Sequence, residues 1–390
     1  MIMTQEGRTL TEVETRDVES VERHSGHLEN VALFLGAGGL AVGATVGLVV
    51  LKDFTAFQGS GWSSVSSISD ITSGVVAGVV FLLSWLWFVH PSWYRGAGVV
   101  RRGVHTVGLT LLVGSLTFFL MRAFNRVIDA AFIGLRFDVW SGTAFIALAC
   151  GVSAYFAASI AARLTLESLS VVVSAFLVMG AMMSAVNTSD QFWWQVHFSS
   201  LGMAPGLAGF TFNYTLILTG VVIATIADFL AYDMRRWLDV TDQGRWKSRV
   251  VSVGLMIMGI ALGGIGLIPV NLSHAGHLFT TYLAVGAFFA LALVAPVILR
   301  GIPWGFRVAS LLIVAFVALL AYLFKGVRYL GTTGFEMLAV STVLVWMVLF
   351  IRTMAAVSRD APKEAEATSE KSTERTPDGN LVAPRRVFSI

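Results

Sequence analysis

The side chains of this sequence that could do chemistry gather around one segment, NTSDQFWWQVHFSSLGMAPGLAGFTF, which covers residues 187–212. It interrupts the apolar second half of the chain and contains no Lys or Arg. Trp193 and Trp194 precede His197, and Ser200 follows it. Tryptophan rings favour the membrane–water interface, where the ring lies among headgroups and its N–H finds a partner. The pattern predicts a short re-entrant or interfacial segment that covers one end of a helix bundle.

Further polar residues are expected at the same level of the membrane. Asn213 follows the segment directly, and Glu336 begins the last apolar run. In GLIPVNLSHAGHLFTTY, His274 and His277 are three residues apart, which places them on one face of a helix. Histidines with a carboxylate could bind zinc and activate water, or could form a hydrogen-bonded cluster. No HExxH or comparable motif is present, so metal binding and enzyme activity stay open, and no cofactor is implied.

These groups have mostly apolar sequence neighbours, which leads to a prediction about their contacts. A lone imidazole or carboxylate in apolar surroundings costs several kcal/mol unless hydrogen bonds or opposite charge compensate it. We therefore expect at least one of the three histidines to lie within hydrogen-bonded or water-bridged reach of Glu336 or Asn213.

Asp228, in IATIADFLAYDM, lies about one turn inside the end of an apolar run. A carboxylate within a membrane span is a functional candidate, and proton relays use such groups. Arg235 and Arg236 follow on the same helix, so an ion pair with them is the alternative expectation.

Composition places the chain in a membrane. Of its 390 residues, 56% are hydrophobic and 13% are charged, whereas soluble domains carry about 25% charged residues. The mean hydropathy is +0.75. The net charge of +3 comes from Lys and Arg in short segments between apolar runs, which membrane topology explains without a nucleic-acid partner.

Ten apolar runs have about the 20 residues that a helix needs to cross a bilayer. Runs of this length predict helices rather than barrel strands, and therefore an all-α, polytopic transmembrane helix bundle. In the first run Gly39, Gly43 and Gly47 recur every fourth residue, a spacing that lets two helices approach closely. The predicted spans cover residues 31–51, 71–89, 104–121, 139–162, 166–186, 211–232, 250–268, 278–299, 306–324 and 335–351.

The loops divide Lys and Arg unevenly between the two sides, and the richer side includes Arg101, Arg245 and Arg300. Because cytoplasmic loops carry the excess of positive charge, this side and both termini are predicted to be cytoplasmic, with residues 187–212 outside. The opposite side carries fewer, namely Lys52, Arg122, Arg126, Arg136, Lys325 and Arg328, and the predicted loop over residues 122–136 is the part that opposes the rule.

A cysteine introduced near Ser60 or Thr188 should therefore react with an impermeant thiol reagent added to intact cells. A cysteine near Gly244 should not react, because the same orientation places it inside. Labelling at Gly244 in intact cells would reverse the predicted topology.

The sequence divides into four regions. Residues 1–30 form a polar cytoplasmic tail, residues 31–163 a four-helix membrane segment, and residues 164–355 a six-helix membrane domain. Residues 356–390 are rich in Glu, Lys, Thr and Pro and are predicted to be disordered. Both membrane regions contain a span, then an outer Trp- and Ser-containing segment, then a Gly-containing helix, so an internal duplication stays open.

Three motifs resemble the bacterial membrane family called domain of unknown function 998 (DUF998), and more distantly the Frag/DRAM/Sfk membrane proteins. The motifs are FSSLGMAPGLAGFTFNYTLILTG, GGIGLIPVNLSHAGHLF and GFEMLAVSTVLVW, and the resemblance covers residues 166–352. It implies a helical membrane bundle and carries over no catalytic residue. The chain departs from the family where IPVN replaces Phe-Pro-x-Asp and where Met337 replaces an Arg after Glu336.

Three functions are compatible with these patterns. The leading hypothesis is an envelope-associated lipid- or apolar-ligand-binding or accessory protein of the bacterial inner membrane, with membrane lipids and a membrane protein as partners. Its ligand would lie beneath the Trp-rich segment. The alternatives are a metal-dependent membrane hydrolase that uses the three histidines and a secondary transporter that uses Asp228.

Overall fold

The computed structural model describes residues 10–59, 62–88 and 92–374. In this part of the chain ten helices are long and apolar enough to cross a membrane. Each of them overlaps one of the ten predicted spans, so the all-α polytopic fold is confirmed and the chain is a multi-pass membrane protein. The apolar core is built around large buried side chains such as Trp85, Trp237 and Trp346.

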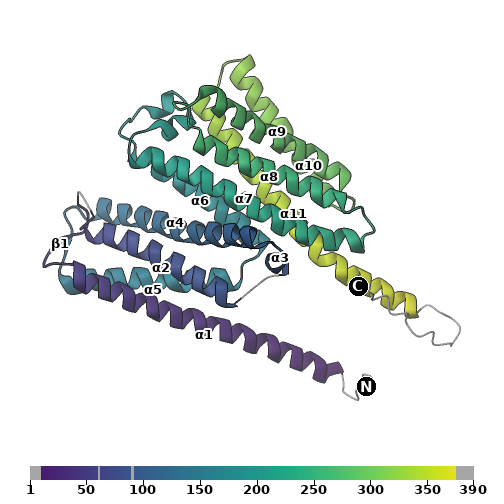
Figure 1. The fold of residues 1–390 in the computed structure, drawn as a ribbon, viewed down its shortest axis with the longest axis horizontal. Coiled ribbons are helices and arrows are strands. Elements are labelled where there is room, and N and C mark those ends of the chain that lie inside the picture. The colour runs from purple at the N-terminus through teal and green to yellow at the C-terminus, as the bar shows by residue number, and fades with distance from the viewer. Residues whose placement is uncertain (1–9, 60–61, 89–91, 375–390) are drawn as a thin grey trace.

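The first four long helices form an N-terminal bundle, drawn in purple and blue in Figure 1. Its helices are α1 (Leu10–Val50), α2 (Val65–Phe88), α4 (Val99–Ala131) and α5 (Val139–Ala162), with the single turn α3 (Ser92–Arg95) between α2 and α4. In this bundle α2 packs on both α4 and α5, and α5 packs on α1. A two-residue antiparallel pair, β1 (Thr55–Ala56) with β2 (Arg136–Phe137), joins the loops at one end.

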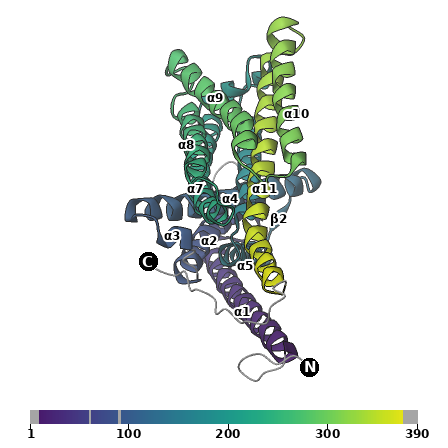
Figure 2. The same cartoon turned by 90° about the vertical axis from the view of Figure 1, so that its right-hand side faces the viewer.

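The remaining helices form a C-terminal bundle. Its helices are α6 (Leu166–Asn187), α7 (Leu207–Val240), α8 (Trp246–Leu267), α9 (His274–Ile298), α10 (Trp304–Ala321) with the π-helical turn η3 (Tyr322–Gly326), and α11 (Thr332–Glu374). Neighbouring helices pack in the order α6, α7, α8, α9, and α11 covers α6, α7 and α10. Figure 2 shows α9 and α10 on the side away from the N-terminal bundle, while α4 joins the bundles by packing on α6 and α7.

Glycines set the closest helix contacts. A Cβ at Gly43 would lie 2.8 Å from both the Ala147 Cα and the Ile146 carbonyl oxygen of α5. The predicted close approach of the first span is therefore made against the fourth long helix. The closest contact of α7 with α8 likewise depends on glycine, because Gly220 faces the backbone of Gly259.

Helices extend into both predicted tails. Helix α1 begins at Leu10, inside the predicted tail of residues 1–30, and α11 continues to Glu374, inside the segment predicted to be disordered. Both segments are rich in Glu, Lys or Arg, which have high helix propensity, and each continues a long helix that is already nucleated. Residues 1–9 and 375–390 lie outside the described residues.

Candidate functional site

The Trp-rich segment is folded onto the end of the C-terminal bundle as two 3₁₀ turns. These turns are η1 (Trp193–Gln195) and η2 (Phe198–Met203), between α6 and α7. Leu201 and Phe212 are buried in a small apolar cluster beneath η2. The side-chain amide of Asn213 donates to the Gly202 carbonyl oxygen at 2.9 Å. Asn213 therefore holds the segment in place.

The two tryptophans have different surroundings. The Trp193 ring is half-buried and packs on Phe198, with ring centroids 6.2 Å apart. The Ser200 hydroxyl donates to the Trp193 carbonyl oxygen at 3.2 Å. Trp194 is 55% exposed. Trp193 and Ser200 thus contribute to packing, whereas Trp194 faces the surroundings, as expected of a residue at the membrane interface.

His197 and Glu336 meet at one serine. The His197 Nδ1 lies 3.0 Å from the Ser199 hydroxyl, and the Ser199 backbone N–H donates to Glu336 Oε2 at 3.1 Å. Glu336 lies on α11, four residues after the start of the helix at Thr332, so this contact ties the Trp-rich segment to the last span. In the described chain no direct hydrogen bond joins one of the three histidines to Glu336 or Asn213, and His197 and Glu336 instead share Ser199 as a partner.

The other two histidines do not join this cluster. His277 is buried, and its Nδ1 lies 3.0 Å from the carbonyl oxygen of Ile268, at the end of α8. His274 is the exposed first residue of α9. In the described parts of the chain no group of three or more His, Cys, Asp or Glu is arranged to hold a metal ion. His197, His274 and His277 therefore do not form a metal-ligand set.

Asp228 pairs across the two bundles. Its Oδ2 lies 3.2 Å from His105 Nε2, and its Oδ1 lies 3.4 Å from Arg101 Nη1, both on α4. Among the described residues neither Arg235 nor Arg236, the expected partners, is within ion-pair distance of it. The expectation of a pair on the same helix was wrong, because α4 brings two basic groups closer than the next turns of α7 can.

The buried His105 ring is held on its other side by Thr225, whose Oγ1 lies 3.0 Å from Nδ1. When the ring is neutral with its proton on Nε2, the Thr225 hydroxyl can donate to Nδ1. When the ring is charged, Nδ1–H donates to the hydroxyl oxygen, whose own proton can turn to the Val221 carbonyl oxygen 3.1 Å away. The Thr225 hydroxyl can therefore hold the ring in either case, with Nε2 beside Asp228.

A second buried acid lies near the opposite end of α4. The fully buried Asp70 on α2 accepts from Arg122 Nη1 at 3.2 Å and from Asn125 Nδ2 at 2.6 Å. The sequence pattern does not reveal this pair, because Asp70 comes just before a predicted span and Arg122 falls in a predicted loop. Helix α2 begins at Val65 and α4 continues to Ala131, so the predicted loop over residues 122–136 is mostly helix.

One face of α4 carries the contacts between the bundles. Successive positions of this face are separated by three or four residues, the spacing that keeps side chains on one side of a helix. The face consists of Arg101, His105, Gly108, Leu112, Ser115, Phe119, Arg122 and Arg126, of which Arg122 pairs with Asp70 of α2 inside the N-terminal bundle. Midway along it the Ser115 hydroxyl lies 2.7 Å from the Tyr214 hydroxyl of α7, and Arg126 donates to Asn187 of α6 at 3.2 Å. The polar residues of this α4 face therefore recur from one end of the interface to the other.

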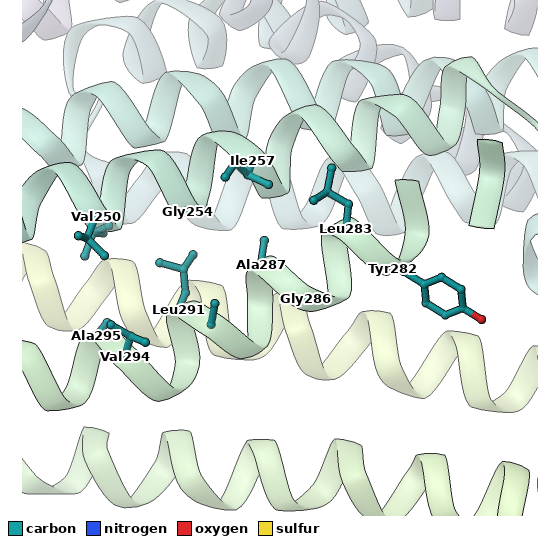
Figure 3. A pocket seen from close by; sticks show the side chains of 12 residues that line it. Val250, Gly254, Ile257, Tyr282, Leu283, Gly286, Ala287, Leu291, Val294 and Ala295 are labelled. Atoms are coloured by element: carbon teal, nitrogen blue, oxygen red, sulfur yellow. The ribbon is translucent and has the colours of Figure 1, made fainter. Parts of the chain in front are cut away.

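A separate groove runs between α8 and α9 on the outside of the C-terminal bundle (Figure 3). It has a volume of about 330 Å³, and apart from the Tyr282 hydroxyl its lining side chains are apolar. At Gly286 a Cβ would have no neighbour within 4 Å, so the groove is open at this point. The lining residues are Val250, Val251, Gly254, Ile257, Tyr282, Leu283, Gly286, Ala287, Ala290, Leu291, Val294 and Ala295.

No family model matches the chain, and neither a curated protein nor a solved structure gives a match.

Proposed function

We propose that this membrane protein binds a membrane lipid, with an acyl chain of the lipid in the α8–α9 groove. The observation that carries the proposal is the continuous apolar lining of this groove. On α9 the lining extends from Tyr282 to Ala295, which corresponds to roughly 20 Å of helix at about 1.5 Å per residue. This length is a large part of the hydrocarbon thickness of a bilayer, about 30 Å.

The proposed groove differs in place from the ligand position expected from the sequence. The Trp-rich segment covers α7 and α11, whereas the groove lies between α8 and α9. Tyr282, 69% exposed, lies at the groove end nearer the start of α9. An aromatic ring with a polar tip at this position suits the interfacial region of a bilayer.

The variant Gly286→Phe tests the proposal, because its ring would fill the groove without displacing a neighbour. We expect lipid retention after detergent exchange, measured by native mass spectrometry, to fall about tenfold. This corresponds to a loss of about 1.4 kcal/mol of binding free energy. The matched control is Gly38→Phe on α1, where a Cβ also has no neighbour within 4 Å.

Unchanged lipid retention in Gly286→Phe would refute lipid binding in the groove. Loss of lipid in Trp193→Ala and Trp194→Ala alone would place the ligand beneath the Trp-rich segment instead.

A second candidate function is proton-coupled transport, with movement of the two bundles along the α4 face. It is favoured by the buried His105–Asp228 contact between α4 and α7, in which Thr225 holds the other side of the ring. Arg101 and, farther along α7, Arg235 are the other charges that act on Asp228. Ionisable side chains inside a membrane span are the groups that proton relays use. Removal of the Asp228 charge should loosen the contact between the bundles.

Spin labels at the exposed positions Val100 on α4 and Val240 on α7 can measure this movement in a Cys150→Ser background. We expect one narrow distance distribution in the unmodified chain and a broader or longer one in Asp228→Asn, because this substitution removes the charge that pairs with Arg101 and lies beside His105. His105→Gln, which removes the buried partner of Asp228, should broaden the distribution in the same way. Distributions in both variants that match the unmodified chain would refute a contact held by this pair.

A further inference from the structure

The α8–α9 groove ends at a pair of basic residues. Lys247 precedes the groove residues Val250 and Gly254 on α8 by three and seven positions, which places it on the same helix face, one turn beyond the lining. Arg300 follows the end of α9, which lies beside the start of α8. The basic pair therefore lies at one end of the apolar lining, where α8 starts and α9 ends.

One side chain holds this basic pair together. The Gln243 Oε1 accepts from Lys247 Nζ at 2.8 Å and from the Arg300 backbone N–H at 3.0 Å. The Gln243 side-chain amide donates in turn to the Arg300 carbonyl oxygen at 3.1 Å. Lys247 is only partly exposed, and the charge of Arg300 acts on it. Two like charges near one another are unfavourable, so an anion between them would be stabilised.

The Asp239 carboxylate, near the end of α7, is already paired. Asp239 is engaged by Arg245, whose Nε and Nη2 donate to its two oxygens at 2.6 and 2.7 Å. Neither Lys247 nor Arg300 takes part in an ion pair with another described residue. The basic pair is therefore available to an anionic ligand.

We propose that Lys247 and Arg300 bind the phosphate of an anionic phospholipid whose acyl chain lies in the groove. The proposal rests on the lipid-binding function and adds the class of headgroup. Lysine and arginine form charge-assisted hydrogen bonds with phosphate oxygens. A soluble phosphate compound would leave the apolar lining unused, whereas a phospholipid matches both parts. In the predicted topology this end faces the cytoplasmic leaflet, whose surface is negative.

The test is lipid selectivity. The purified protein is equilibrated in detergent with equal amounts of phosphatidylglycerol and phosphatidylcholine that carry the same acyl chains, and bound lipids are counted by native mass spectrometry. We expect the unmodified protein to retain several-fold more phosphatidylglycerol. The double variant Lys247→Gln, Arg300→Gln should bring the ratio close to one while total lipid is maintained. Arg236→Gln, an exposed residue near the same end of α7, is the matched control.

The outcomes separate the headgroup site from the groove. A double variant that keeps the original ratio would refute the headgroup site, even if Gly286→Phe still abolishes binding. If the ratio of phosphatidylglycerol to phosphatidylcholine falls in the double variant while Gly286→Phe retains all lipid, the basic pair binds the headgroup and the acyl chain does not lie in the groove. A melting temperature equal to that of the unmodified protein shows that each variant is folded.

Discussion

Gly220→Leu is expected to separate α7 from α8 and to lower the free energy of unfolding by about 3 kcal/mol or more, at the upper end of the usual cost of overpacking. A Cβ at Gly220 would meet the Gly259 carbonyl oxygen and would lie 2.8 Å from the Gly263 nitrogen. Both neighbours are backbone atoms, which cannot move aside by changing a rotamer. The only relief is a shift of a whole helix. Because α8 forms one wall of the groove, lipid retention should fall together with stability.

Thermal unfolding in detergent, monitored by circular dichroism, measures this effect. Gly38→Leu is the matched control, because a Cβ at Gly38 has no neighbour within 4 Å. We expect Gly38→Leu to unfold within a few degrees of the unmodified protein and Gly220→Leu to unfold far earlier. Equal melting temperatures for the two variants would show that α7 and α8 are not in close contact at Gly220.

Asp70→Leu is the second change with a large expected effect. It leaves the Arg122 guanidinium, whose side chain is 24% exposed, without its carboxylate partner inside the N-terminal bundle. It also removes the acceptor of the shortest Asn125 hydrogen bond. Removing one partner of a buried ion pair costs about 3–5 kcal/mol, since an uncompensated charge is left behind. The variant should therefore unfold at much lower denaturant concentration than the unmodified protein.

The double variant Asp70→Leu, Arg122→Met tests the cause of that loss. When both charges are replaced by apolar side chains of similar size, most of the stability should return, because no unpaired charge remains. A double-mutant cycle measured by denaturant unfolding gives the coupling free energy between the two residues. If the double variant is no more stable than Asp70→Leu alone, charge pairing is not what Asp70 contributes.

The sequence by itself determined the membrane fold and the positions of its helices. Hydropathy is a local property, and a bilayer requires about 20 apolar residues per helix wherever the helix comes to pack. For this reason the ten spans could be located before any tertiary contact was known. The row of Gly39, Gly43 and Gly47 also identified a face of close approach, because small residues at this spacing need no knowledge of the partner.

The tertiary structure alone decided which polar groups meet. Sequence distance favoured Arg235 as the partner of Asp228, but the partner histidine is His105, on a helix 123 positions earlier in the chain. Sequence distance likewise gave no sign of the Asp70–Arg122 pair. It also favoured a cluster of three histidines, which His274 and His277 do not join. A helix can present each residue in only one direction and at one depth, and both depend on how it rotates against its neighbours. That rotation is set by side-chain packing over several helices at once, which no single run of sequence contains.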